Sequence, residues 1–392
     1  MRRPFCMARR HPLQNTLAPL LLPLSLMYGG AALLRRRLAE HGLPRARFFS
    51  RPCVSVGNIS WGGTGKTPVT DWLLDWAGAR GLRAAVLTRG YGARAPFRPF
   101  PVNAGASPAH SGDEPLMLAR RHPEALILAD PDRNRAARHA LGDALPPALF
   151  ILDDGFQHLS TGRHLDLVLL DADDLDDGAS SGWNRVLPAG TWREPAACLN
   201  AADAFVLKLD PAAWPDALPK LRRRLASFPR PIFAFCLRPQ GLLACGQNSA
   251  PLLPADAVPG PYLLTSAVGN PVQVRRSAES FMGRAPEAHL IFPDHHDYSG
   301  REDARRLSAP GLPVLCTAKD AVKLGSLKLP ALYTLEVKAD FYAAAWPDDA
   351  QGPDFESWWN AWWACTPFLP HARAQAGHAR CEARGTTGGA PL

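Results

Sequence analysis

The order of apolar and polar positions predicts short buried strands that alternate with helices along most of the chain. Each expected strand is a short apolar run that ends in a polar or glycine-containing turn, and a segment with helical spacing follows. This alternation is typical of a doubly wound, mostly parallel α/β sheet with helices on both faces. A β-branched run begins at Val54, and the further strands expected in this part are Ala84–Leu87, Leu126–Ala129, Leu149–Leu152, Asp166–Leu170 and Ala204–Leu209.

A second group of strands and helices follows a proline-rich helical stretch near residues 211–230. The strands expected there are Ile232–Leu237, Tyr262–Ser266, His289–Phe292, Val314–Thr317 and Leu332–Val337. We therefore expect a larger core at residues 41–230 and a smaller α/β domain at residues 231–365 that ends in a tryptophan-rich helix. Residues 366–392 lack apolar periodicity and are expected to form a disordered tail.

A glycine-rich turn joins the first strand to the first helix of the core and ends in Gly65-Lys66-Thr67. Glycines at such a turn let backbone N–H groups approach phosphate oxygens, and the helix N-terminus favours anions. Lys66 can reach the terminal phosphates and Thr67 can hold Mg²⁺. Ser60 stands where the usual phosphate-loop pattern has its first glycine, so the loop is a variant. The residues expected to surround a nucleotide are Ser60, Trp61, Gly62, Gly63, Thr64, Gly65, Lys66 and Thr67.

Polar residues follow other expected strands of the core, at the sheet edge where ligands of parallel sheets bind. Asp153 and Asp154 end an apolar strand, and either carboxylate could hold Mg²⁺ beside the phosphate loop. Asp113 is a candidate general base, although aspartate is also common where a helix starts. His158 could contact a phosphate or close a loop.

The second group of strands contributes two more polar clusters. Asp294-His295-His296-Asp297 is either catalytic or a hydrogen-bonded surface turn. Thr317–Lys323 offers two lysines for a phosphate, and the alternative is an ordinary helix start.

Residues 1–40 contain an uncharged apolar stretch, Leu17–Leu34, with arginines on both sides. A secretory signal would export a nucleotide-dependent enzyme away from its nucleotide, so we discount it. A membrane-spanning helix is marginal because the stretch is near the minimum of about 18 residues, and Pro19 and Pro23 interrupt it. An interfacial helix fits better, since its apolar side chains would enter the headgroup boundary while the arginines meet anionic lipid. A helix packed on the protein's own core is the remaining alternative.

Composition narrows the class of protein only in part. With 46% apolar and 20% charged residues, the chain is an ordinary globular protein. Its net charge of +8 suits nucleic acid, an anionic membrane or a phosphorylated substrate, and does not choose among them. The eight cysteines have no C-x-x-C spacing, which indicates reduced thiols in a cytosolic protein and no disulfide or metal framework.

Taken together, these segments resemble the tetraacyldisaccharide 4′-kinase family, the lipid A 4′-kinases. The resemblance runs from about residue 15 to about residue 340 in the family's order, and Ile151–His158 is its most specific stretch. The other matching stretches are Val56–Asn58, Gly62–Pro68, Thr88–Gly92, Gly112–Pro115, Asp132-Arg133, Leu187-Pro188, Arg193–Pro195, Phe292–His296 and Lys319–Lys323. The chain departs from the family at Ala318, at Ala267-Val268 and at Thr191-Trp192.

The resemblance implies a P-loop kinase that transfers a phosphoryl group from ATP, with Mg²⁺, to the 4′-hydroxyl of a lipid A disaccharide 1-phosphate. It also implies the cytoplasmic face of the inner membrane of a Gram-negative bacterium, and no nucleic-acid partner. Lys66 would hold the phosphates and Asp113 would accept the hydroxyl proton, assisted by His295 in preference to His296. The further implied roles are Mg²⁺ binding by Thr67, Asp153 or Asp154, and Glu194, and stabilisation of phosphate charge by Arg133, His158 and Arg193.

Two other functions stay open on the residues alone. A P-loop GTPase or metallochaperone would use hydrolysis as a switch, and its N-K-x-D-type motif has only Thr317-Ala318-Lys319-Asp320 as an approximate counterpart. A non-enzymatic membrane adaptor could have kept the fold. Preference for guanine would indicate the switch, and an unaffected Lys66→Ala variant would indicate the adaptor.

Overall fold

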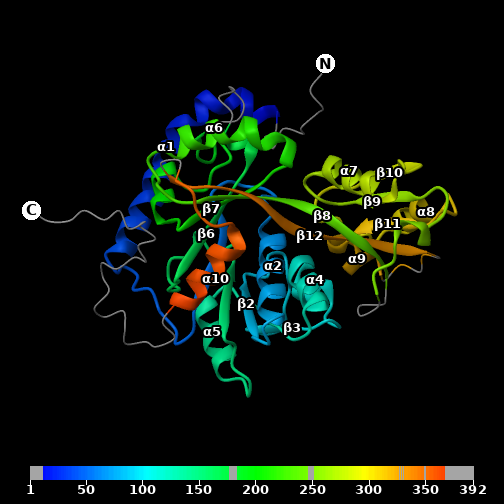
Figure 1. The fold of residues 1–392 in the computed structure, drawn as a ribbon, viewed down its shortest axis with the longest axis horizontal. Coiled ribbons are helices and arrows are strands. Elements are labelled where there is room, and N and C mark those ends of the chain that lie inside the picture. Colours follow the sequence, from blue (N-terminus) through cyan, green and yellow to red (C-terminus); the bar gives the residue numbers. More distant parts are fainter. Residues whose placement is uncertain are drawn as a thin grey trace, which may run out of the picture.

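One mixed sheet runs through the whole molecule, in the strand order β10-β9-β11-β12-β8-β7-β6-β1-β5-β2-β4-β3. The computed structural model describes residues 12–175, 183–245, 251–325, 327, 329, 331–347 and 350–366. Among these residues, neighbouring strands are parallel except for β8 with β12 and β3 with β4. Helices cover both faces of the sheet (Figure 1). The predicted doubly wound, mostly parallel α/β fold is confirmed, and the predicted tail beyond Thr366 lies outside the described residues.

The larger group of strands contains the predicted core elements together with the short strand β3, which the sequence pattern did not predict. Its elements are β1 (Cys53–Asn58), α2 (Lys66–Gly78), β2 (Ala84–Thr88), β3 (Phe100–Val102), α3 (Pro108–Ser111), α4 (Asp113–Arg121), β4 (Leu126–Ala129), α5 (Arg133–Leu141), β5 (Leu149–Asp153), β6 (Leu165–Leu170), η2 (Ala196–Ala201), β7 (Ala204–Lys208) and α6 (Trp214–Leu225).

Successive side chains of the buried strands serve opposite faces of this part of the sheet. Val54 and Val56 pack with residues of α2 and α4, whereas Cys53 and Phe150 pack with residues of α5. This alternation follows from the two-residue period of a strand. Val56 is paired with Asp153, so the carboxyl ends of β1 and β5 reach the sheet edge together. The phosphate loop and the aspartate pair are therefore neighbours.

A long antiparallel ribbon, β8 (Ile232–Ala244) with β12 (Leu332–Ala345), joins the two groups of strands into one sheet (Figure 1). The first residues of β8 pair with β7, and the first residues of β12 pair with β11. Both strands extend well beyond the predicted ranges. The parts beyond the predicted ranges include Arg238, Pro239 and Gln240 in β8 and Lys338 and Asp340 in β12, and the pairing register shifts twice, so no continuous apolar run marks the full length of either strand.

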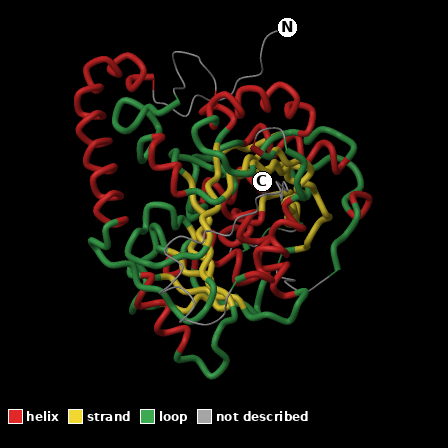
Figure 2. Tube along the Cα trace, turned by 60° about the vertical axis from the view of Figure 1, so that its left-hand side comes forward, coloured by secondary structure: helices red, strands yellow, loops and turns green. Residues whose placement is uncertain are grey.

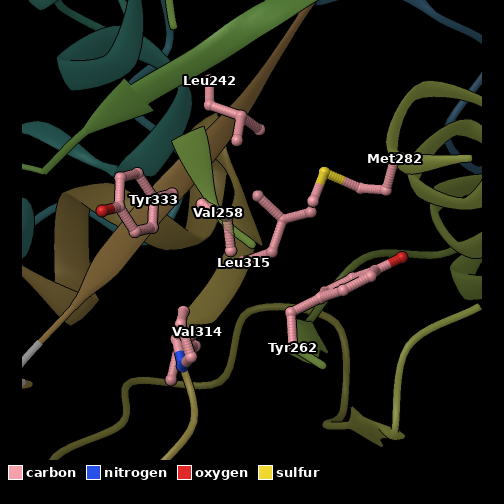
Figure 3. Close-up of a pocket in the computed structure, with 8 residues that line it drawn as sticks. Leu242, Val258, Tyr262, Met282, Val314, Leu315 and Tyr333 are labelled. Atoms are coloured by element: carbon pink, nitrogen blue, oxygen red, sulfur yellow. The ribbon is translucent and has the colours of Figure 1, made fainter. Parts of the chain in front are cut away.

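The second lobe consists of the remaining strands and helices around the far end of this ribbon. Its elements are β9 (Leu263–Ser266), α7 (Pro271–Met282), β10 (Ala288–Ile291), α8 (Arg301–Ser308), β11 (Val314–Thr317) and α9 (Ala318–Leu324). Figure 3 shows Leu315, Tyr262 and Met282 around a narrow apolar gap inside this lobe. The gap leaves no room for a water molecule, so this part of the lobe is packed core.

Helix α1 (Pro12–Glu40) runs along the outside of the larger part of the molecule (Figure 1 and Figure 2). One narrow stripe of the helix touches the body: the Ala189 N–H donates to Ser25 Oγ over 2.8 Å, Gly29 lies against Pro195, and Arg36 is buried. Only 11% of the most apolar stretch of this helix is buried. By length and composition, Leu17–Glu40 could cross a membrane. The exposed apolar side chains include Leu17, Leu20, Leu22, Leu24, Leu26, Met27 and Leu34.

The tryptophan-rich helix α10 (Phe355–Cys365) packs on the body, as predicted. Trp359 and Trp363 meet the ring of Trp76 edge-on, with centroid distances of 5.3 and 5.1 Å. Asn360 Oδ1 accepts a hydrogen bond from Trp76 Nε1 over 2.8 Å. Because Trp76 lies on α2, α10 braces the helix that begins at Lys66.

We expect Trp359→Ala to lower the free energy of unfolding by about 3–5 kcal/mol, because it empties a fully buried aromatic site. Urea denaturation followed by tryptophan fluorescence and circular dichroism measures the change. Ser357→Ala, on the exposed side of the same helix, should change stability by no more than about 0.5 kcal/mol. Equal stability of the two variants would show that α10 does not brace the body.

Candidate active site

The glycine-rich turn between β1 and α2 has the backbone geometry of a phosphate cradle. Gly62 and Gly65 have φ angles of 125° and 96°, which favour glycine, and α2 begins directly after Gly65. A Cβ atom at Gly65 would lie 2.8 Å from the ring of Phe235, so a larger residue does not fit. Trp61, in the same turn, is 64% exposed.

The same turn carries buried polar atoms that the protein itself leaves unpaired. Ser60 Oγ, Thr64 Oγ1 and Asn58 Oδ1 have no hydrogen-bond partner among the described residues. Buried polar groups are normally satisfied, so unpaired ones beside a phosphate-type loop fit a site that closes around a ligand. A helix N-terminus with free N–H groups adds affinity for an anion.

Asp154 lies between two cations at the mouth of the loop. Arg193 Nη1 donates to both carboxylate oxygens over 2.9 and 2.8 Å, and Lys66 Nζ is 3.5 Å from Oδ1. Burial alone would raise the pKa of the Asp154 carboxyl, but the charges of Lys66 and Arg193 outweigh burial and hold the pKa below its usual value. Asp154 therefore stays ionised. Its backbone is in the left-handed region, with a φ of 50°, which is unusual for a residue other than glycine.

Asp153, its neighbour, has the opposite character. Burial, followed by repulsion from Glu114 and Asp154, raises the pKa of its carboxyl to about 6. Thr88 Oγ1 donates to Asp153 Oδ2 over 2.8 Å and fixes its orientation. Adjacent carboxylates with separated pKa values are typical of functional sites.

Thr67 forms its side-chain hydrogen bond with a third carboxylate. Its hydroxyl donates to Glu114 Oε2 over 2.7 Å, and Lys319 Nζ lies 3.7 Å from the other oxygen of Glu114. Glu114 is a site residue that the sequence pattern did not indicate, although it stands in the Gly112–Pro115 motif directly after Asp113. A second carboxylate at the start of the same helix was the available signal.

Asp113 lies in the larger part of the molecule and contacts two residues of the second lobe. His295 Nδ1 is 3.2 Å and Lys323 Nζ is 2.6 Å from Asp113 Oδ2. Burial alone would raise the pKa of the Asp113 carboxyl, but hydrogen bonds from His295 and Lys323 outweigh burial and lower the pKa. An ionised carboxylate paired with a histidine has the arrangement of a general base.

The two adjacent histidines have different partners. His295, at a φ of 99°, faces Asp113, while His296 Nε2 contacts Asp303 Oδ2 over 2.8 Å within its own lobe. Lys323 also donates to the backbone carbonyls of both histidines, over 3.1 and 2.8 Å. Lys319 donates to Asp294 over 3.0 Å. The two lysines that were expected to bind phosphate therefore contact carboxylates and the turn that contains His295 and His296, which we call the histidine turn.

Arg133 contacts the backbone of the aspartate pair, and His158 lies in the loop that follows it. Arg133 is 4% exposed, and its Nη2 donates to the Asp153 carbonyl over 3.4 Å. His158 Nε2 is 3.2 Å from Ser160 Oγ. Burial and the positive charges of Arg133 and Arg163 lower the pKa of His158 to about 4, so the imidazole is neutral at physiological pH.

Glu194 is the implied metal ligand that the structure does not support. Both of its carboxylate oxygens are engaged by arginines of α1, Arg35 at 2.9 Å and Arg36 at 2.5 Å, and the side chain is 1% exposed. These contacts place Glu194 in a buried ion-pair cluster with α1 and not in the group around Lys66 and Thr67. Its neighbour Arg193 does reach the site, where it binds Asp154.

The donor set at the loop suits Mg²⁺ bound together with phosphates. Among the described residues, no three histidine, cysteine or acidic side chains converge into a preformed metal cage. Mg²⁺ usually takes one or two protein carboxylates and completes its shell with water and phosphate oxygens. Thr67, Glu114, Asp153 and Asp154 offer such a partial set of oxygen ligands.

Comparison with known proteins gives this arrangement a context. Residues 17–349 match the model of the LpxK family, tetraacyldisaccharide-1-P 4′-kinase. The chain is 48% identical over 352 residues to the tetraacyldisaccharide 4′-kinase of Nitratidesulfovibrio vulgaris, covering 90% of this chain and 96% of the relative. It is 37% identical over 346 residues to that of Pseudomonas paraeruginosa, covering 87% and 92%.

A solved structure is similar in fold as well as sequence. It is the crystal structure of the "apo" form of LpxK from Aquifex aeolicus in complex with ATP, with a TM-score of 0.65 and 29% identity over 83% of this chain and 95% of that chain. The family match spans the phosphate loop, both carboxylate clusters and the histidine turn of the second lobe. This chain therefore belongs to the tetraacyldisaccharide-1-P 4′-kinase family.

Proposed function

We propose that this protein transfers the γ-phosphoryl group of ATP to the 4′-hydroxyl of a tetraacyldisaccharide 1-phosphate, a step in lipid A synthesis. The observation that carries the proposal is the convergence of a phosphate loop, an aspartate pair and the Asp113–His295 contact at one sheet edge. Family membership supports the same reaction and disfavours a guanine-nucleotide switch.

Each group at the edge has a role in this reaction. Lys66 and the loop N–H groups bind the phosphates, and Arg193 adds positive charge beside Asp154. Thr67, Glu114, Asp153 and Asp154 would hold Mg²⁺, which neutralises charge on the transferred group. Asp113 accepts the hydroxyl proton, and His295 and Lys323 hold its carboxylate ionised. Positioning and charge neutralisation supply most of the rate enhancement in phosphoryl transfer.

A groove at the C-terminal end of α1 supports binding of the substrate's existing phosphate. This open groove has a volume of about 730 Å³, and its lining residues are Ala39, Glu40, Gly42, Arg45, Ala46, Arg47 and Phe48. The Arg47 N–H donates to the Ser160 carbonyl over 3.0 Å, so the groove adjoins the loop that follows His158. Guanidinium groups suit a sugar phosphate, and an amphiphilic substrate would reach this groove along α1.

The exposed apolar side of α1 supports association with the cytoplasmic face of the inner membrane. Its docked stripe lies along the body, which suits a helix at the interface more than one that leaves the body to span the bilayer.

We expect the triple substitution Leu20→Ser, Leu24→Ser and Met27→Ser to move the protein from the membrane fraction to the soluble fraction, since each side chain is exposed and apolar. Each removes apolar surface worth about 1.5–3 kcal/mol when buried in lipid. Fractionation of cells and flotation with vesicles measure the distribution. Substitution of Leu145, an exposed leucine remote from α1, is the matched control, and equal effects of the two changes would refute the role of α1.

The raised pKa of Asp153 predicts a pH dependence of Mg²⁺ activation. Because this pKa is about 6, the carboxyl binds a proton below that pH and must release it before it can hold a cation. The free Mg²⁺ concentration for half-maximal rate should rise about ten-fold per pH unit below this pKa and level off above it. Titrations of Mg²⁺ at a fixed ATP concentration between pH 5 and 8 test this, and a pH-independent constant would contradict it.

The proposed function is tested with purified protein in detergent, radiolabelled ATP and the tetraacyldisaccharide 1-phosphate. A doubly phosphorylated lipid with the new phosphate at the 4′ position is the expected product, located by mass spectrometry and ³¹P NMR. The 4′-deoxy disaccharide is the matched control acceptor and should yield none. Nucleotide hydrolysis with a preference for GTP and without an acceptor product would instead indicate a switch.

A further inference from the structure

Helix α1 makes a buried ionic contact with the body close to the phosphate site. Arg36 is 4% exposed, and its Nη2 lies 2.5 Å from Oε2 of Glu194, which is 1% exposed. Charges are rarely buried to this extent unless the pair has further hydrogen-bond partners. Both partners have further connections, and these lead to the same residue of the site.

The first connection runs through Phe156. Arg36 Nη2 also donates to the Phe156 carbonyl over 3.0 Å, and the guanidinium lies 4.3 Å from the centre of the Phe156 ring. Phe156 is fully buried and follows Asp154 by two residues. It also lies against Gly57 at the end of β1, where a Cβ atom would be 2.5 Å from Phe156 Cβ. Arg36 thus fixes the backbone just after Asp154.

The second connection runs through Glu194. Its neighbour Arg193 binds both oxygens of Asp154, and the Arg193 N–H donates to the Ile59 carbonyl over 2.7 Å. The left-handed backbone of Asp154, at a φ of 50°, persists only where surrounding contacts hold it. The Arg36 guanidinium therefore supports Asp154 in two ways. It holds the backbone at Phe156, and it holds Glu194, the neighbour of the Arg193 that binds Asp154.

We propose that Arg36 is a positioning residue: from α1, and through Phe156 and Glu194, it holds Asp154 in the geometry that the phosphate site requires. The helix that faces the membrane is then part of the framework of the active site as well as an anchor. This inference rests on the proposed function, because Asp154 matters through its place beside Lys66 and the phosphates.

The test compares Arg36→Met with Arg37→Met, which removes an exposed arginine from the next position of α1. Arg36→Met should lower kcat about 10- to 100-fold, the usual effect of losing a partner that orients a ligand, and should change the KM for the lipid little. Arg37→Met should stay within about two-fold of the wild type in kcat. Arg36→Lys keeps a charge beside Glu194 but lacks the planar fork, so it should lose kcat in the same direction and serves if Arg36→Met does not fold.

Two further measurements separate positioning from loss of stability. In an Asp154→Asn background, Arg36→Met should lower kcat by no more than about two-fold, because the residue through which it acts is already impaired. Leu307→Ala, which opens a cavity in the second lobe, should lower the melting temperature without lowering kcat at 25 °C. A full additional loss in the Asp154→Asn background, or an unchanged kcat in Arg36→Met, would overturn the inference.

A readout independent of catalysis keeps the two proposals distinct. Binding of a fluorescent ATP analogue is measured with and without Mg²⁺, and Arg36→Met should reduce the Mg²⁺-dependent gain in affinity as Asp154→Asn does. If the wild type transfers no phosphate to the lipid, the proposed function fails, and this binding comparison still decides the inference. An equal Mg²⁺-dependent gain in Arg36→Met and wild type would refute it.

Discussion

Asp113→Asn is expected to reduce kcat about 10²- to 10⁴-fold while the affinity for ATP stays near that of the wild type. The amide has nearly the shape of the carboxylate, but it cannot accept the proton of the sugar hydroxyl. Asp113 lies between His295 and Lys323 at the junction of the two lobes. The phosphate-loop residue Thr67 pairs with Glu114 and not with Asp113. The loss should therefore appear in the chemical step and leave nucleotide binding unaffected.

Steady-state kinetics and a nucleotide-binding titration separate these effects. Asp303→Asn makes the same substitution at the partner of the neighbouring histidine, His296, and should change kcat by only a few-fold. If Asp113→Asn instead abolished ATP binding, Asp113 would belong to the metal or phosphate site. Equal losses in the two variants would mean that the histidine turn is needed only for folding.

Lys66→Ala should lower kcat about 10²- to 10³-fold, the usual effect of removing one preorganised group from developing charge. Lys66 Nζ is 3.5 Å from Asp154 Oδ1, so after the substitution the Asp154 carboxylate keeps its contact with Arg193 but loses that with Lys66. Single-turnover phosphoryl transfer measures the chemical step directly.

Lys338→Ala is the matched control, since Lys338 is an exposed lysine paired with Asp75 away from the loop. It should leave kcat within about two-fold of the wild type. If Lys66→Ala kept full activity, the phosphate loop would not act in catalysis, and a non-enzymatic adaptor would become the better account.

Much of the fold could be predicted because its strands are short, apolar and buried. Val314–Thr317 and Leu126–Ala129 coincide with β11 and β4, since each run is apolar, buried and ends at a polar turn. The β8–β12 ribbon could not be predicted in full. Pro239 and Gly241 interrupt one strand, its partner carries charged residues, and the pairing depends on contacts between distant segments.

The same contrast holds within the site. The phosphate loop and the aspartate pair can be predicted from local sequence, because their functional residues belong to the same short segments that form the turns after β1 and β5. The pairing of Thr67 with Glu114 and the engagement of Glu194 by Arg36 join segments far apart in the chain. Only the resemblance to a family suggested that His295 and Asp113 act together, and the structure places these two side chains in contact.

The central claim is that a magnesium-bound triphosphate lies in the cradle of Gly65, Lys66 and Thr67 with the carboxylates of Glu114, Asp153 and Asp154 beside it. A crystal structure with Mg²⁺ and a non-hydrolysable ATP analogue tests it most directly. We expect the terminal phosphate between Lys66 and Asp113, with the metal next to Thr67. A triphosphate bound elsewhere, with the cradle closed by its own side chains, would contradict the account.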